Sequence, residues 1–194
     1  LAPYQVVIVP IYKSNEQLKV VSEVALKVKK ELEELGVSVK FDNRDTHKPG
    51  WKFAEYELKG VPLRLSLGNR DLENETIEIA RRDTMEKETV QISNIGNKVV
   101  DLLDKIQKNL YSRADNFREE NTFIVNTFDE FKDYIKIGGF VYAHWDGSCE
   151  TEEKIKKETK ATIRCIPQDV SDEEGVCIFS GKRSVRRVLF AKAY

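Results

Sequence analysis

The chain has 194 residues, enough for one large domain or two small ones. Hydrophobic residues make up 40% of it and charged residues 34%, which predicts a folded core and excludes a disordered chain. The net charge of −1 excludes a uniformly basic nucleic-acid binder, so any binding of that kind would use local patches.

The sequence also lacks the marks of a membrane or secreted protein. No apolar run is long enough to span a membrane, and the first residues do not form a secretory signal. The cysteines Cys149, Cys165 and Cys177 lie far apart without a Cys-x-x-Cys pair. They predict no disulfide framework, so we expect a cytoplasmic protein with reduced thiols. Leu1 in place of methionine indicates a fragment or a processed chain.

The first elements predict an α/β unit. The apolar run 4–9 is typical of a buried strand, which we expect to end at Pro10. Apolar residues then recur at helical spacing from Leu18 to Leu35, and Gly36 closes the helix. A second strand over 37–41 completes a right-handed parallel strand–helix–strand unit.

Residues 42–84 place polar clusters between apolar segments, and we expect them to contain the binding site. The polar loop 42–48 follows the carboxyl end of the second strand, the edge where open α/β sheets bind ligands. Loops on a rigid scaffold also hold most binding residues. After the loop the pattern predicts a helix over 50–59 with Pro49 in its first turn, strands over 61–67 and 76–80, and a turn over 68–71.

The amphipathic repeat from Ile95 to Leu110 predicts a long helix, so we expect the first domain to cover residues 1–112. Residues 113–121 are interpreted as a linker or a helix extension. The second domain, residues 122–194, begins with a capped helix after Thr127. Its other predicted elements are a charged helix over 150–160 and strands over 140–145, 162–166, 176–179 and 188–191.

No motif for binding a nucleotide phosphate or for nucleophilic catalysis occurs. The absence of G-x-G-x-x-G, Walker and G-x-S-x-G sequences argues against a small nucleotide-dependent enzyme. His47 and His144 are interpreted as hydrogen-bonded structural residues. The cysteines lack the close pairs of a zinc site, so we interpret them as buried or incidental thiols, with Cys165 in the core.

Glu57, Arg70 and Asp71 stand out among the charged residues. Glu57 lies near the end of the helix over 50–59, and Arg70 and Asp71 lie in the next turn. A carboxylate can accept the ring and amino N–H groups of guanine, and a basic–acidic pair can serve a second base. Such contacts suit the unstacked bases of an RNA loop. A surface ion pair between Glu57 and Arg70, worth under about 1 kcal/mol, is the alternative.

A basic patch lies near the end of the sequence. Between Gly175 and Tyr194 there are five basic residues and no acidic side chain. The pattern fits a charged strand edge as well as a site for phosphate or a partner, and both interpretations stay open. The five residues are Lys182, Arg183, Arg186, Arg187 and Lys192.

Two sets of motifs together resemble one known family. The first set covers residues 42–44, 49–53, 57–64, 68–73 and 81–83, after an opening Val-Ile-Val-Pro-Ile run. The second set covers residues 143–147, 158–167 and 190–194. They resemble the anticodon-binding and C-terminal domains of prolyl-tRNA synthetases of the eukaryotic and archaeal-like type, over essentially the whole chain. The resemblance implies an α/β fold class, with a three-layer mixed-sheet anticodon-binding domain followed by a smaller α+β domain.

The resemblance implies the tRNA-binding part of a proline–tRNA ligase. Such an enzyme uses ATP and magnesium to attach L-proline to tRNA(Pro) through prolyl-adenylate. The full enzyme would be a cytoplasmic homodimer without DNA or membrane partners. Its catalytic domain would lie upstream, so the fragment alone would be inactive and would need no cofactor. The alternative is a free-standing anticodon-domain paralogue acting as an RNA-binding or regulatory subunit.

The same resemblance assigns roles to residues of the first domain. In the family, residues matching Glu57, Arg70 and Asp71 read the two guanines of the proline anticodon. A supporting role, holding the RNA backbone or the loop, is expected for Arg44, Lys52 and Arg82.

The resemblance also bears on zinc and on the last residue. Some members hold zinc with two cysteine pairs, but here the second pair is Cys177-x-x-Ser180 and the first begins at Asp146, with Cys149 out of register. We therefore expect no zinc site and interpret Cys177 as a remnant. In zinc-bearing relatives the terminal tyrosine carboxylate reaches towards the catalytic site, which implies that role for Tyr194.

Overall fold

The computed structural model describes residues 2–168 and 172–192. The chain divides into two compact units, Leu1–Ser112 and Arg113–Tyr194. Among the described residues, no helix combines the length and the hydropathy needed to cross a membrane.

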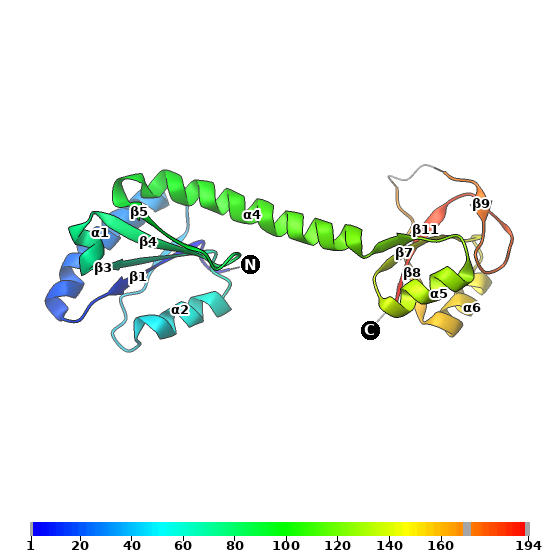
Figure 1. Cartoon of the computed structure of the whole chain (residues 1–194), viewed down its shortest axis with the longest axis horizontal. Helices are drawn as coiled ribbons and strands as arrows, with labels where there is room; N and C mark the ends of the chain where they lie inside the picture. Colours follow the sequence, from blue (N-terminus) through cyan, green and yellow to red (C-terminus); the bar gives the residue numbers. More distant parts are fainter. Residues whose placement is uncertain (1, 169–171, 193–194) are drawn as a thin grey trace. The chain divides into compact units, whose positions relative to one another are not determined.

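The first unit has three layers, with a five-stranded mixed sheet in the middle (Figure 1). Strand β1 pairs in parallel with β2 and β3, whereas β3, β4 and β5 pair antiparallel. Helices α1 and α4 cover one face of the sheet and α2 covers the other. The predicted α/β class with a mixed sheet is confirmed. The strands are β1 (Val6–Ile11), β2 (Val39–Phe41), β3 (Leu63–Gly68), β4 (Thr76–Arg81) and β5 (Lys87–Gln91). The helices are α1 (Asn15–Glu34), α2 (Pro49–Leu58), the short α3 (Asn69–Glu73), the 3-10 turn η1 (Ile92–Asn94) and α4 (Ile95–Glu120).

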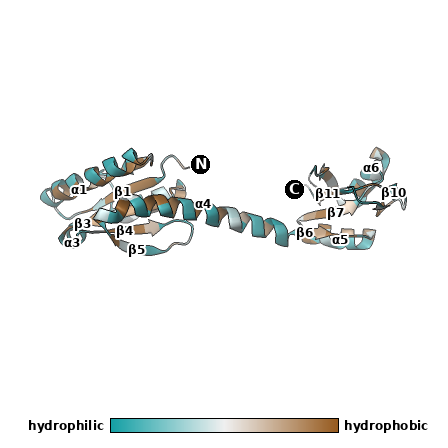
Figure 2. Cartoon of the chain, turned by 90° about the horizontal axis from the view of Figure 1, so that it is seen from above, coloured by the Kyte–Doolittle hydropathy of each residue, from teal (hydrophilic) through white to brown (hydrophobic). Residues whose placement is uncertain are grey.

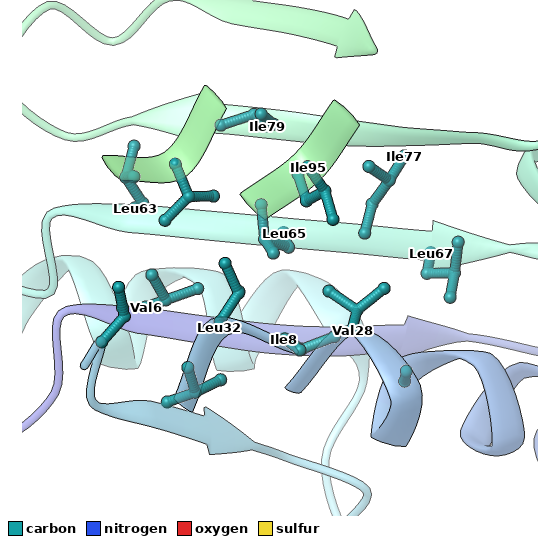
Figure 3. Packing of buried hydrophobic residues seen from close by; sticks show 14 of the residues in the cluster. Val6, Ile8, Val28, Leu32, Leu63, Leu65, Leu67, Ile77, Ile79 and Ile95 are labelled. Atoms are coloured by element: carbon teal, nitrogen blue, oxygen red, sulfur yellow. The ribbon is translucent and has the colours of Figure 1, made fainter. Parts of the chain in front are cut away.

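The central strand β1 is apolar on both faces because it supplies both cores. Side chains alternate along a strand, so Val6 and Ile8 pack towards α1 and α4 while Val7 and Val9 pack towards α2. In Figure 3, Val28 and Leu32 of α1 lie beside β1. The first half of α4 carries the apolar residues of this core, and its last turns are hydrophilic (Figure 2).

Two local predictions in this unit are wrong. Strand β1 does not end at Pro10 but continues to Ile11. Val6 and Ile8 form their backbone bonds towards β2, and Pro10 faces the same side, where β2 has already ended. The missing N–H of Pro10 therefore removes no ladder bond. The predicted turn over 68–71 is instead the start of α3, because the Asp71 carboxylate accepts the Gly68 N–H at 2.8 Å.

A buried polar cluster fixes the loop between β2 and α2. The Asp42 carboxylate accepts bonds from Arg44 Nε (2.9 Å), Arg44 Nη2 (2.6 Å) and the Tyr56 hydroxyl (3.2 Å). Lys52 of α2 is only 1% exposed, and its ammonium donates to the carbonyl oxygens of Asp42 (3.0 Å) and Arg44 (2.5 Å). The Lys52 side chain therefore fixes the backbone of the loop that precedes α2.

The pKa values of this cluster follow from burial and from charge. Burial raises the pKa of Asp42, but the hydrogen bonds from Arg44 and the nearby cations outweigh it and lower that pKa from 3.8 to about 2. Burial and the charge of Asp42 raise the pKa of Tyr56 to about 12. Burial lowers the pKa of Lys52, and the charge of Asp42 opposes this shift.

The second unit is a smaller α+β fold. Its four-stranded sheet has the order β6-β7-β11-β8, and β9 and β10 form a separate pair. The aromatic rings of Phe131 and Phe190 meet edge to face in its core, with centroids 5.1 Å apart. Its strands are β6 (Thr122–Ile124), β7 (Phe140–His144), β8 (Ala161–Cys165), β9 (Gly175–Val176), β10 (Arg183–Ser184) and β11 (Arg187–Lys192). Its helices are α5 (Phe128–Ile137) and α6 (Cys149–Thr159).

Two predictions for the second unit are wrong. The strand predicted over 176–179 is only β9, because the chain turns directly after it, with the Gly181 N–H bonded to the Cys177 carbonyl. Cys165 is exposed at the end of β8 rather than buried in the core. A strand end on a small sheet has too few neighbours to cover it.

The close approach of Gly175 to His144 provides a test of the second core. A Cβ atom at position 175 would lie 2.2 Å from His144 Nε2. Because His144 is buried and bonded to Ser184, the Gly175→Ala chain should lose about 1–3 kcal/mol of unfolding free energy. Thermal denaturation measures this loss. The control is Gly50→Ala, where an added Cβ meets nothing within 4 Å. Equal melting temperatures for the two variants would contradict the packing described.

The Asp42 cluster predicts a pH-dependent stability. Because the folded pKa of Asp42 is below its ordinary 3.8, the stabilisation is complete above about pH 5 and is lost as the pH falls towards 2. The unaltered chain should therefore lose about 2 kcal/mol more unfolding free energy across that range than the Asp42→Asn chain. Urea denaturation at a series of pH values gives the slope of unfolding free energy against pH for each of the two chains. Asp104→Asn, on an exposed part of α4, is the control. Parallel slopes for the unaltered and Asp42→Asn chains would rule out the cluster as the cause.

Candidate functional site

Glu57 lies in the last turn of α2 with its carboxylate partly open to solvent. Its side chain is 45% exposed, and Oε1 accepts a bond from Arg64 Nη1 at 3.3 Å. Arg82 Nε donates to the Glu57 carbonyl oxygen at 2.8 Å. The backbone of Glu57 is therefore held by Arg82, while the carboxylate keeps acceptor capacity for a ligand.

The Arg64 side chain is a candidate that the sequence analysis missed. It leaves β3 on the side of α2, is 9% exposed, and has its guanidinium carbon 3.6 Å from the centre of the Phe53 ring. Nη2 lies 3.8 Å from Glu78 Oε1, and Nε is buried without a hydrogen-bond partner in the described part of the chain. Burial lowers the pKa of Arg64. The signal available in the sequence was an arginine that alternates with leucines in a predicted strand.

These side chains surround a small hollow of about 20 Å³. Its rim offers a carboxylate acceptor, guanidinium donors and an aromatic face within one patch. That combination suits a flat polar ring with donors on one edge and acceptors on another. The lining includes Phe53, Tyr56, Glu57, Arg64, Arg81 and Arg82.

Arg70 and Asp71 lie in α3, beyond the carboxyl end of β3. One Asp71 oxygen caps α3 through the Gly68 N–H, and the exposed Arg70 guanidinium forms no hydrogen bond or ion pair with any described residue. Both residues line a groove of about 540 Å³. The rest of its lining is Ile11, Tyr12, Lys13, Gln17, Gly68, Asn69 and Glu73.

The structure does not bring Glu57 and Arg70 together. Glu57 contacts Arg64 near the start of β3, whereas Arg70 follows its end, and a strand advances about 3.3 Å per residue. The surface ion pair considered between Glu57 and Arg70 is therefore replaced by the pair of Glu57 with Arg64. The candidate site consists of two separate points joined by one rigid strand.

The three supporting residues contact the protein itself. The buried Lys52 ammonium holds the loop after β2, so it does not reach a ligand in this structure. Arg82 is exposed and holds the end of α2. Arg44 is 41% exposed, but its guanidinium is bonded to Asp42 and Glu55. Lys52 and Arg82 thus position the site, and of the three Arg44 and Arg82 keep an exposed surface.

The basic patch of the second unit is largely neutralised within the chain. Arg183 pairs with Glu174, Arg186 with Asp172 at 2.7 Å, and Arg187 with Glu173 at 2.9 Å. Arg187 also donates to the Val125 carbonyl at 2.7 Å. These contacts favour the charged-surface interpretation over a phosphate site.

A hydrogen-bonded cluster occupies the region of the degenerate cysteine pairs. Asp146 Oδ2 accepts bonds from Thr151 Oγ1 at 2.8 Å and from Ser180 Oγ at 2.6 Å. The Ser180 N–H donates to the Cys177 sulfur at 3.5 Å. One thiol, one carboxylate and two hydroxyls do not form the sulfur and nitrogen ligand set of a structural zinc site. Within residues 2–168 and 172–192, no group of three His, Cys, Asp or Glu side chains could hold a metal.

The other candidate residues of this unit are separate from the cluster or outside the description. Cys149 begins α6 and is exposed, as is Cys165. Burial raises the pKa of Asp146, but the bonds from Ser180, Ser148 and Thr151 outweigh it and lower that pKa overall. Tyr194 lies outside the described residues.

Comparison with known families matches both units. The family described as "Anticodon binding domain" matches residues 5–102, and the family described as "Prolyl-tRNA synthetase, C-terminal" matches residues 128–194. Similar curated proteins are each called proline–tRNA ligase. The relative from Porphyromonas gingivalis (strain ATCC 33277) is 60% identical over 194 residues, which is 100% of this chain and 39% of the relative.

Further relatives give the same result. The one from Parabacteroides distasonis is 57% identical over 100% of this chain and 39% of its own length, and the one from Christiangramia forsetii is 57% identical over 100% and 40%. The chain thus spans about two-fifths of the length of these relatives. With both family matches, the chain belongs to the anticodon-binding-domain family, in the form that prolyl-tRNA synthetases carry together with their own C-terminal domain.

Proposed function

We propose that this chain is the part of a proline–tRNA ligase that binds the anticodon of tRNA(Pro). The main support is the partly exposed Glu57 carboxylate beside the Arg64 guanidinium, on a backbone that Arg82 holds in place. The two side chains offer a carboxylate acceptor and guanidinium donors at one place on the surface.

Guanine fits this first point by its hydrogen-bonding pattern. Its Watson–Crick edge presents a ring N–H and an amino group, which a carboxylate such as that of Glu57 accepts together. The neighbouring edge carries O6 and N7, two acceptors suited to a guanidinium such as that of Arg64. Adenine has an acceptor in place of the ring N–H, so its ring nitrogen would face the Glu57 carboxylate without a hydrogen bond.

The second point is assigned to Arg70 and Asp71. Arg70 has its donors free among the described residues, and one oxygen of Asp71 remains available after capping Gly68. Their groove is wide enough for a base with part of its sugar. Because the two points lie at opposite ends of β3, they suit two bases splayed apart in a loop rather than stacked.

We further propose the activity of the whole enzyme from the names of the relatives. That enzyme would join L-proline to tRNA(Pro) with ATP and magnesium through prolyl-adenylate, in the cytoplasm and as a homodimer. None of the residues described above performs that chemistry. The free-standing paralogue is less favoured, because the match to the ligases continues through both units.

The second unit is proposed to fold without zinc. Its four converging residues are Asp146, Thr151, Cys177 and Ser180. The Asp146 carboxylate accepts the Thr151 and Ser180 hydroxyls, and the Cys177 sulfur accepts the Ser180 backbone N–H. Three of these four groups would have to become thiolates to give the four-cysteine ligand set of a structural zinc site. The cluster thus substitutes for the metal as a link between the start of α6 and the turn after β9.

The Glu57→Gln chain tests the first recognition point. It keeps the shape of the side chain but offers one acceptor in place of two, so it can no longer accept the ring N–H and the amino group of guanine together. We expect binding to tRNA(Pro) to weaken by about 1–3 kcal/mol and discrimination against an anticodon with adenine in place of guanine to disappear. Fluorescence titration at two salt concentrations separates this from general charge effects.

Glu23→Gln is the matched control for that titration. Glu23 is exposed on α1, which covers the opposite face of the sheet. It loses the same charge at a place where no contact with the anticodon is proposed. If Glu57→Gln and Glu23→Gln both bind and discriminate like the unaltered chain, the assignment of Glu57 is wrong.

The zinc proposal is tested by restoring thiols. The triple variant Asp146→Cys, Thr151→Cys, Ser180→Cys adds three sulfurs around Cys177 and should bind one zinc per chain with a raised melting temperature. Elemental analysis after growth with added zinc gives the stoichiometry. The unaltered chain should hold no zinc and should melt at the same temperature with and without a chelator. One zinc per unaltered chain would overturn the proposal.

A further inference from the structure

Tyr12 occupies a position that the proposed readers do not explain. It follows the end of β1 and is half-buried. On one side it lines the groove of Arg70 and Asp71, and on the other it lines a separate pocket of about 160 Å³. That pocket is completed by Pro10, Asp45, His47, Lys48, Pro49 and Lys52.

The Tyr12 side chain has no partner within the described residues. Its hydroxyl forms no hydrogen bond, and its ring stacks on no other described ring. The backbone beside it is nevertheless fixed, because the Lys13 N–H donates to Gln17 Oε1 at 2.8 Å at the start of α1. An aromatic ring is therefore held between two hollows without a structural task of its own.

The smaller pocket has the chemistry of a stacking site. The ring of His47 lies parallel to that of Trp51, with centroids 3.7 Å apart, and Thr46 Oγ1 lies 2.9 Å from His47 Nδ1. These contacts fix the orientation of the imidazole ring, which lines the pocket. A volume of about 160 Å³ is below the range of roughly 300–1,000 Å³ typical of drug-sized ligands, but it suits a single heterocycle.

Each hollow has an exposed lysine that could meet a phosphate, beside the acidic Asp71 and Glu73 in the groove and Asp45 in the smaller pocket. Lys13 lines the groove of Arg70, Lys48 lines the smaller pocket, and both are exposed. A strand of RNA that passes over Tyr12 would have one lysine on each side for its phosphates. Asp45 also lines the smaller pocket, and its negative charge repels a phosphate group. The part of the RNA that enters this pocket is therefore the base.

We infer that the pocket between Tyr12 and His47 takes a third unstacked base of the same RNA loop, adjacent in the strand to the base in the Arg70 groove. This inference rests on the proposed anticodon binding. Tyr12 separates the two bases and offers each a ring face. Stacking tolerates every base, so this pocket strengthens binding without reading the sequence.

The inference predicts that a change at Tyr12 affects RNA binding differently from a change at a residue that reads a base. Tyr12→Ala should weaken binding of the anticodon stem-loop of tRNA(Pro) roughly 5- to 150-fold, and equally for an anticodon with adenine in place of guanine. The ratio of the affinities for the guanine and the adenine anticodon then stays unchanged, whereas Glu57→Gln should bring this ratio close to one. Tyr12→Phe should bind like the unaltered chain, because the hydroxyl has no partner.

An RNA with one abasic nucleotide identifies the occupant. The abasic site is placed in turn on either side of the base assigned to Arg70. At one of these two positions it should weaken binding to the unaltered chain as much as Tyr12→Ala does. The Tyr12→Ala chain should lose nothing further with that RNA. Tyr111→Ala, an exposed tyrosine of α4, is the control and should bind like the unaltered chain.

The binding experiments can distinguish a failure of this inference from a failure of the proposed anticodon binding. An unaltered chain that fails to prefer the guanine anticodon overturns the proposed function and the pocket with it. A chain that discriminates through Glu57, yet binds equally well with Tyr12→Ala and with both abasic RNAs, overturns the pocket alone. Loss of discrimination in Tyr12→Ala would also overturn it, because Tyr12 would then read the base. If Tyr12→Ala does not fold, the abasic RNAs still decide with the unaltered chain, because equal binding of both would overturn the pocket.

Discussion

The candidate site depends on the hydrogen bonds of one buried carboxylate, that of Asp42. It gathers Arg44 and Tyr56, while the Lys52 ammonium beside it bonds the loop carbonyls, so one cluster joins the end of β2 to the start of α2. A buried carboxylate with a cation and hydrogen bonds is tolerated, whereas removal of one partner leaves an uncompensated charge. The direction of α2, and hence the place of Glu57 at its far end, follows from this cluster. Residues outside the two recognition points therefore determine where the readers lie.

Strand β3 sets the distance between the two recognition points. It is fully buried along its length and pairs on both sides, with β1 and β4, so its ends cannot move independently. Arg64 leaves it near one end and α3 begins at the other. A loop of RNA must therefore adapt to the protein, with its bases opened to match a fixed spacing. This rigid spacing allows specificity to be divided between two small sites, each with few contacts.

Much of the fold could be predicted from hydrophobic periodicity, and the rest depended on tertiary context. Helix α1 and strand β1 followed from their apolar patterns, and Glu57 followed from its chemistry and from the resemblance to a family. Arg64 was missed because burial of an arginine depends on the ring of Phe53 and on Glu57, which sequence spacing does not bring together. The burial of Lys52 was hidden for the same reason. The strand residue Pro10 was misjudged because only pairing shows that its missing N–H faces no partner.

The cluster around Asp146 changes the conditions that would damage the second unit. A zinc–thiolate site fails when its sulfurs are oxidised, but here the only sulfur of the cluster, that of Cys177, is buried and bound to a backbone N–H. The bonds from Thr151 and Ser180 depend instead on the charge of Asp146, whose pKa is lowered by them. Protonation would remove that acceptor, so this link weakens as the pH falls and is indifferent to peroxide. A link that rests on a carboxylate is therefore sensitive to acid rather than to oxidants.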